Sequence, residues 1–123
     1  MPATDEDDAS RQLRLVRQAI LSETSPCFEW DARAASNARD RCCGLQPFEI
    51  KRLVFEHVND GGRLRQREES DEEWRNRRKF DFWYSVCFEV DGLDDPIFVK
   101  IALLCDDEEF PEARIVGAHM SSS

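Results

Sequence analysis

Residues 80 to 90 alternate between apolar and polar side chains, and this alternation constrains the fold more than any other feature of the chain. A period of two is typical of a β-strand with one buried face. The side chains expected on the buried face are Phe80, Phe82, Tyr84, Val86, Phe88 and Val90. Turn-forming residues at 91–96 favour a chain reversal. The apolar run 97–105 and the segment 113–119 then predict a three-stranded antiparallel meander.

Three helices are expected before these strands. Ser10 and Asp31 are suitable N-caps, and Pro47 suits a first helical turn. Gly44 would end the second helix, at about residues 32–43. This order predicts an α+β fold in which three N-terminal helices pack on one face of a C-terminal three-stranded antiparallel sheet.

The length of 123 residues suits one domain. Residues 1–9 are acidic and lack apolar anchors, so we expect a disordered N-terminus, a single domain over 10–119 and a tail at 120–123. The charge-dense segment 63–79 is expected to be a loop with a short helix near Trp74. No stretch is apolar enough to span a membrane, and the acidic N-terminus does not resemble a secretory signal. These features predict a cytoplasmic protein without a membrane partner.

The chain contains five cysteines, and their spacing fits neither a disulfide framework nor a zinc site. We interpret them as reduced thiols. Motifs for a nucleotide or metal cofactor are also missing from the sequence, so no cofactor and no metal is expected.

The formal net charge of −9 argues against nucleic-acid binding, because phosphate affinity depends on clustered lysines and arginines. However, residues 51–79 contain nine basic and seven acidic side chains, whereas residues 81–123 contain ten acidic side chains and only two basic ones. Such asymmetry creates local fields that the net charge conceals.

Lys100 interrupts the apolar run and should share a strand face with Phe98, Ala102 and Leu104. Its stem could cover an apolar patch while the ammonium reaches water, or the rigid strand could present the ammonium to a phosphate. His119 could supply the acid–base chemistry that imidazole performs near neutral pH, or it could simply be exposed near the end of the last strand.

Arginines concentrate in two stretches, 63–67 and 75–79. They could form two arms of a phosphate-binding surface, with Trp74 and Trp83 offering planes for base stacking. Acidic residues intervene, so a self-neutralising salt-bridged loop is the other interpretation.

Four features, taken in order, resemble the MqsR-type toxins of bacterial toxin–antitoxin systems. They are the stretch Gly44-Leu45-Gln46-Pro47-Phe48-Glu49-Ile50-Lys51, a tryptophan-containing first strand, Ile97-Phe98-Val99-Lys100-Ile101 and a terminal strand that closes on His119. The resemblance covers about residues 44–119. This chain departs from the family in its arginine-rich insertion, its acidity, the lack of the usual Gln-Asp pair after the tryptophan, and Phe98, where the family commonly has tyrosine.

The resemblance implies a RelE-like architecture and a metal-independent endoribonuclease that cleaves messenger RNA and pairs with a cognate antitoxin. On this ribonuclease hypothesis we assign acid–base work to His119, phosphate stabilisation to Lys51 and Lys100, and a polar helper role to Tyr84. Arg75, Arg77, Arg78 and Trp83 would hold the RNA.

The alternative is a non-catalytic interaction module, similar to an immunity protein or an inhibitor. In that case the acidic residues Asp94, Asp95 and 106–109 should form one exposed face that docks on a basic protein.

Overall fold

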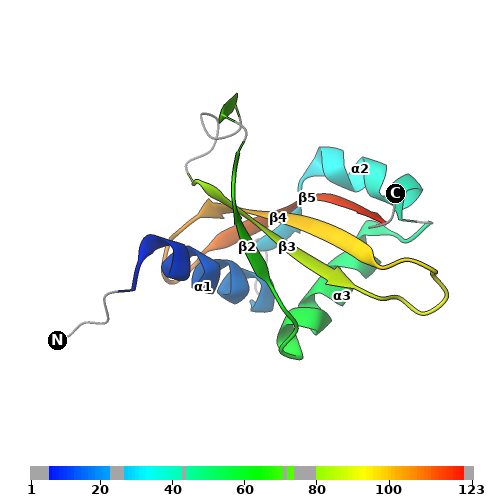
Figure 1. Ribbon diagram of the computed structural model, residues 1–123, viewed down its shortest axis with the longest axis horizontal. Helices are drawn as coiled ribbons and strands as arrows, with labels where there is room; N and C mark the ends of the chain where they lie inside the picture. Colours follow the sequence, from blue (N-terminus) through cyan, green and yellow to red (C-terminus); the bar gives the residue numbers. More distant parts are fainter. Residues whose placement is uncertain (1–5, 23–26, 43, 71, 74–79, 121–123) are drawn as a thin grey trace.

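The computed structural model describes residues 6–22, 27–42, 44–70, 72–73 and 80–120, and Figure 1 shows their arrangement. The helices are α1 (Asp8–Leu21), α2 (Ala32–Arg41) and α3 (Pro47–Asn59). The strands are β1 (Phe28–Trp30), β2 (Arg65–Glu68), β3 (Phe82–Phe88), β4 (Ile97–Cys105) and β5 (Glu112–Met120). They form one five-stranded sheet in the order β1-β5-β4-β3-β2.

The α+β class is confirmed, but the prediction of a three-stranded antiparallel sheet was wrong in detail. β1 pairs in parallel with β5, so the sheet is mixed. At three residues, β1 is too short to show a period of two. β2 lies inside the segment expected to be a loop, and its sequence Arg-Gln-Arg-Glu carries no apolar signal. It is an edge strand that pairs only with β3 among the described residues.

The helix starts follow local capping chemistry. The N-cap of α1 is Asp7 rather than Ser10, and its carboxylate accepts a hydrogen bond from the Ser10 amide at 2.7 Å. Residues 6–9 therefore belong to the start of the domain. Of the segment 1–9, for which we expected disorder, residues 1–5 lie outside the described residues. Asp31 caps α2 as predicted, and α3 begins at Pro47.

Most of the core lies between the sheet and two of the helices, and α2 contributes the buried Ala38 to it. Apolar side chains at alternate positions of β3, β4 and β5 pack against α1 and α3. The buried residues of these helices are Leu15, Val16, Ala19 and Ile20 on α1 and Ile50, Val54 and Val58 on α3. Tyr84, Val86, Ile97, Val99 and Ile101 face them from the sheet with at most 1 % exposure.

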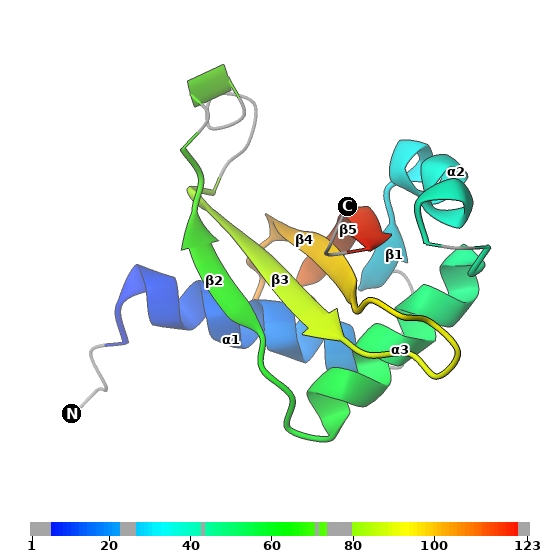
Figure 2. The same cartoon turned by 45° about the vertical axis from the view of Figure 1, so that its right-hand side comes forward.

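The placement of α2 differs from the prediction that all three helices cover one face. Figure 2 shows α1 and α3 on one side of the sheet and α2 beside β5 at the other side. α2 follows β1 directly, so the short parallel strand carries it to this edge. The face of the sheet that α1 and α3 do not cover is therefore bordered by α2.

A β-bulge in β5 changes which side chains reach this uncovered face. Lys100 pairs with Gly117, but the next residue, Ile101, pairs with Ile115, so Val116 is an extra residue. Ala113 and Ile115 point to the core before the bulge, and Ala118 does so after it. Because an inserted residue reverses the alternation, His119 lies on the uncovered face instead of in the core.

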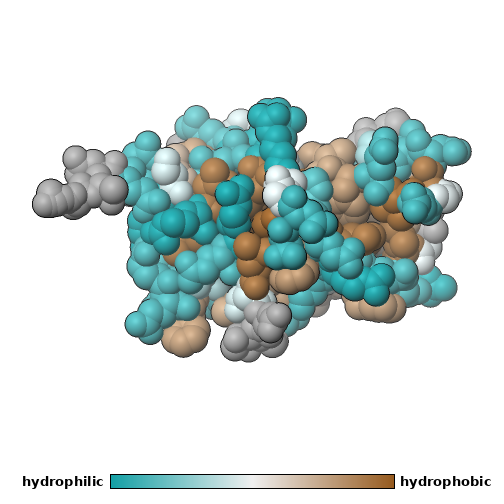
Figure 3. All heavy atoms as spheres, turned by 90° about the horizontal axis from the view of Figure 1, so that it is seen from below, coloured by the Kyte–Doolittle hydropathy of each residue, from teal (hydrophilic) through white to brown (hydrophobic). Residues whose placement is uncertain are grey.

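The molecular surface in Figure 3 shows hydrophobic residues in several areas between hydrophilic side chains. The most exposed large apolar side chains, Phe48 and Phe110, belong to α3 and to the β4–β5 loop respectively. No helix in the described parts of the chain is long and apolar enough to cross a bilayer.

Candidate nucleic-acid interface

Three aromatic side chains from three adjacent strands form a row on the uncovered face of the sheet. His119 of β5 stacks on Phe98 of β4, with ring centroids 5.2 Å apart and an interplanar angle of 27°. Phe98 in turn meets Trp83 of β3 edge to face, at 6.3 Å and 67°. All three are partly exposed, so the row gives this face an aromatic surface.

Lys100 lies beside this row. It pairs with Ser85 on one side and Gly117 on the other, and its ammonium is 4.7 Å from the centre of the Trp83 ring. The same ammonium is 3.9 Å from the carboxylate of Glu69. A cation–π contact and an ion pair therefore hold the charge above the sheet, with 33 % of the side chain exposed.

Ser85 is the buried polar residue of this face. It pairs with Arg65 of β2 on one side and with Lys100 of β4 on the other, and it is only 2 % exposed. Phe98 pairs with Cys87, four residues along β3 from Trp83, so the indole and the phenyl ring must lean toward each other along the strands to come within 6.3 Å.

The hydrogen bond of His119 decides its tautomer. Nδ1 is 2.9 Å from the backbone carbonyl oxygen of Met120. A carbonyl oxygen can only accept, so Nδ1 carries the hydrogen of the neutral ring and Nε2 presents a lone pair. Phe98 pairs with His119, and Lys100 follows Phe98 by two residues on β4, so the backbone positions of His119 and Lys100 are offset by about 7 Å along the strand direction and lie on the same face.

Two residues that the ribonuclease hypothesis assigned to the same site lie elsewhere. Lys51 is on α3, which covers the opposite face, and its ammonium is 3.6 Å from Glu29 and 6.0 Å from the Phe28 ring centre. Tyr84 is fully buried in the core, where its hydroxyl accepts a hydrogen bond from Gln66 at 3.0 Å. Neither side chain can act on a ligand that lies on His119 and Lys100.

The expected RNA-binding residues divide into two groups. Trp83 belongs to the aromatic row, whereas Arg75, Arg77 and Arg78 lie outside the described residues. Arg65 and Arg67 of β2 are exposed and pair with Ser85 and Trp83, so both lie at the edge of the uncovered face. Arginines occupy every second position in 63–67, which is the period of a strand, but we predicted that this segment is part of a loop.

Sequence reasoning missed three further arginines. Arg33 and Arg41 of α2 and Arg114 of β5 line a groove of about 440 Å³ between α2 and the sheet. In sequence they are isolated charges on a surface helix and on an apolar strand. Only the position of α2 beside β5 brings them together.

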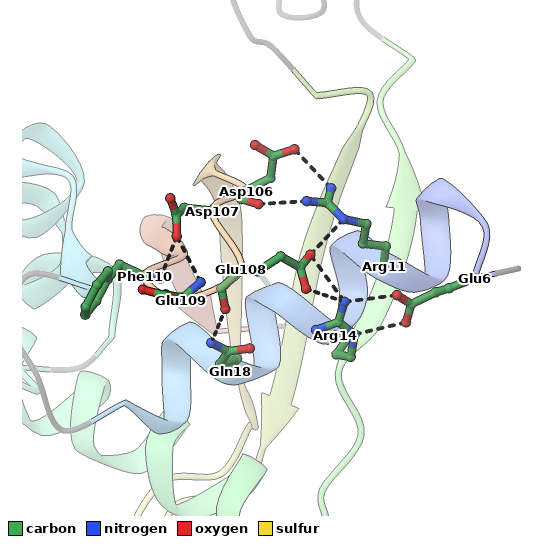
Figure 4. A network of polar contacts seen from close by, with 9 residues as sticks. All are labelled: Glu6, Arg11, Arg14, Gln18, Asp106, Asp107, Glu108, Glu109 and Phe110. Atoms are coloured by element: carbon green, nitrogen blue, oxygen red, sulfur yellow. Dashed lines mark hydrogen bonds and ion pairs between the residues drawn. The ribbon is translucent and has the colours of Figure 1, made fainter. Parts of the chain in front are cut away.

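The acidic residues do not gather on one face, as the interaction-module hypothesis required. Asp94 and Asp95 precede β4 and residues 106–109 follow it, so a nine-residue strand about 30 Å long separates them. Figure 4 shows that the second group is bound to α1. Arg11 contacts Asp106 at 3.0 Å and Glu108 at 2.8 Å, and Arg14 contacts Glu108 at 2.9 Å.

This network also includes the start of α1. Arg14 forms an ion pair with Glu6 at 2.9 Å, and its hydrogen bonds lower the pKa of the Glu6 carboxyl. The Gln18 amide donates to the Glu108 carbonyl oxygen at 2.9 Å. The acidic loop therefore serves to hold α1 against the β4–β5 turn.

Within the described ranges, no group of three histidine, cysteine, aspartate or glutamate side chains is close enough to hold a metal ion. No family model matches the chain, and neither a curated protein nor a solved structure shows significant similarity to it.

Proposed function

We propose that this protein is a metal-independent endoribonuclease that acts on single-stranded RNA, with the role of a messenger-RNA-cleaving toxin. The observation that carries the proposal is the position of His119 and Lys100 on one aromatic face, with Nδ1 of His119 bound to a backbone carbonyl oxygen. A base and a fixed cation on one surface are the groups that phosphodiester cleavage requires.

Binding of single-stranded RNA is supported by the aromatic row. Unpaired bases stack on exposed aromatic planes, whereas the bases of a duplex are not accessible to them. Trp83 and Phe98 are partly exposed aromatic side chains on this face, and Arg65, Arg67 and Lys100 supply cations for the phosphates. The negative net charge is thus compatible with a local cationic surface.

The chemistry uses the ribose 2′-hydroxyl as the nucleophile. Nε2 of His119 takes the hydroxyl proton while O2′ forms a bond to phosphorus, and the P–O5′ bond breaks. The products are a 2′,3′-cyclic phosphate and a 5′-hydroxyl, which acquires its proton from the imidazolium or from water. Lys100 stabilises the additional negative charge on the phosphorane oxygens.

In this proposal Lys51 and Tyr84 have no catalytic role, because they lie in other parts of the fold. The toxin role and a cognate antitoxin rest on the resemblance to MqsR-type toxins. An antitoxin that covers the face of His119 and Lys100 would block both RNA binding and cleavage.

The direct test is cleavage of a labelled single-stranded RNA in the presence of a metal chelator. We expect His119→Ala to lower the cleavage rate by about 10²- to 10⁴-fold and Lys100→Ala by about 10²-fold. The matched controls are His57→Ala and Lys51→Ala, which remove the same residue types from α3 and should retain most of the activity.

The toxin role is tested separately by induced expression in a bacterial host. Growth arrest by the parent and normal growth with His119→Ala would support it. The endoribonuclease proposal is wrong if the folded parent leaves the RNA intact, or if His119→Ala cleaves as fast as the parent.

A further inference from the structure

We propose that the groove between α2 and the strands β4 and β5 is a subsite for one unpaired nucleotide of the RNA, next to the cleaved phosphodiester. This inference rests on the proposed function and adds to it the position of the substrate strand. Figure 2 shows α2 standing beside β5, next to the uncovered face of the sheet. The groove has a volume of about 440 Å³.

The charge of the groove suits a phosphate. Arg33 and Arg41 approach it from α2 and Arg114 from β5. Among the described residues, these three guanidinium groups form no ion pair within 4.0 Å. The one carboxylate in the lining, Asp31, already accepts a hydrogen bond from the Ala34 amide as the N-cap of α2. The arginines are therefore available to bind a phosphate in bidentate fashion.

The groove also offers apolar surface and an amide. Leu104 is 43 % exposed, and Val116 is the extra residue of the bulge. They provide a surface for a ribose or base, while the Asn37 side chain can both donate and accept hydrogen bonds at a base edge. Sites for small ligands typically have volumes of roughly 300–1,000 Å³, so the groove suits one nucleotide and is too small for a duplex.

The groove is continuous with the proposed catalytic face. Gly117 lies in its lining and pairs directly with Lys100. Arg41 lines both the groove and a second depression, which Asp40, His119 and Met120 also line. A strand whose scissile phosphate lies at Lys100 and His119 can therefore place its neighbouring nucleotide between α2 and β5.

Gly117 provides a selective way to fill the groove. Its backbone does not require a positive φ, and a Cβ at this position would meet its nearest atom, Cβ of Lys100, at 4.0 Å. A Cβ therefore has room at this position, and a valine, which suits a strand, projects its methyl groups from the floor of the groove. Gly117→Val should fold as the parent does.

The experiment measures the binding of a labelled single-stranded RNA oligonucleotide. All proteins carry His119→Ala, so that the RNA stays intact, and each double variant has one further substitution. We expect Gly117→Val to weaken binding by at least about tenfold, with an unchanged melting temperature. Arg114→Ala should weaken binding and reduce the slope of log affinity against log salt concentration by about one. Arg52→Ala, which removes an exposed arginine of α3, is the control and should leave both quantities unchanged.

The outcomes separate the two proposals. If the parent cleaves RNA but Gly117→Val and Arg114→Ala bind as tightly as the control, the nucleotide subsite is wrong and the ribonuclease proposal stands. Binding of an acidic peptide that Gly117→Val abolishes, with RNA affinity unchanged, would also overturn the subsite and assign the groove to a protein ligand. A parent that neither binds nor cleaves RNA overturns both.

Discussion

The imidazole of His119 lies stacked on the phenyl ring of Phe98, with the two ring centroids 5.2 Å apart. This contact exists because the bulge at Val116 turns His119 away from the core and toward the face that carries Phe98 and Lys100. The stacking and the hydrogen bond from Nδ1 to the Met120 carbonyl together fix the ring plane and the free nitrogen. Phe98 therefore acts as a positioning residue for the proposed base.

Replacement of Phe98 by leucine tests this positioning role. An aromatic pair contributes about 0.5–1.5 kcal/mol beyond the buried area, which corresponds to roughly a two- to tenfold slower cleavage. The loss should appear in kcat rather than in KM. Phe98→Tyr keeps the ring and should restore most of the rate. Equal rates for the leucine and tyrosine variants would show that the ring does not position His119.

In the proposed RNA complex Glu69 would compete with a phosphate for Lys100, because its carboxylate is 3.9 Å from the ammonium and only 8 % of the residue is exposed. Glu69→Gln should therefore raise the affinity for single-stranded RNA. Partly exposed ion pairs contribute about 0.2–1 kcal/mol, so the expected gain is at most about fivefold at low salt. The neighbouring Glu68→Gln removes the same charge from an exposed position and is the control. An equal gain in both variants would mean that net charge, not the contact with Lys100, limits binding.

Tyr84 should give the protein a stability loss at alkaline pH. Burial raises the pKa of this phenol to about 12, and the hydrogen bond from Gln66 offsets part of that increase. In the unfolded chain a tyrosine ionises near pH 10, at about its usual pKa. The protonated phenol is thus favoured by folding, so its contribution to the free energy of unfolding is complete below pH 10 and is lost as the pH rises toward 12.

Tyr84 is the only tyrosine of the chain, so the near-ultraviolet absorbance of tyrosinate reports this group alone. Tyr84→Phe should remove the tyrosine's part of the alkaline stability loss and should leave RNA cleavage unchanged. Ionisation near pH 10 in a protein that is still folded would contradict the burial of the phenol.

Arg11 should stabilise the fold by holding the β4–β5 loop against α1. It forms ion pairs with Asp106 and Glu108, and Nη2 also donates to the Asp106 carbonyl oxygen at 2.9 Å. We expect Arg11→Ala to lower the melting temperature, with a smaller loss at high salt because exposed charges are screened. Arg52→Ala removes an arginine whose partner Glu56 lies on the same helix, and should cost less. Equal melting temperatures for both variants would show that the network in Figure 4 does not stabilise the protein.

Local patterns in the sequence predicted the parts of this fold that neighbouring residues determine. The alternation in residues 82–88 correctly separated the buried Val86 from the exposed Cys87. Asp31 and Pro47 marked the starts of two helices, and Lys100 was correctly placed on the same strand face as Phe98. Such predictions succeed because the helical and strand periods are properties of a few consecutive residues.

The composition of the candidate site, in contrast, depended on contacts between distant segments. Strict alternation from the buried Ile115 would place His119 in the core. The bulge that arises where β5 pairs with β4 reverses the alternation and puts His119 on the other face. The ribonuclease hypothesis grouped Lys51 and Tyr84 with Lys100, but helix packing and strand alternation put them on the other side of the sheet.

The sequence by itself thus determined which segments are helices, which are the central strands, and which residue types are available for chemistry. The tertiary structure alone decided that β1 and β2 complete the sheet, that α2 forms a groove with β5, and that His119 shares a face with Lys100. The physical reason is that edge pairing, bulges and grooves arise from the register and packing of segments far apart in the chain, which no local period encodes.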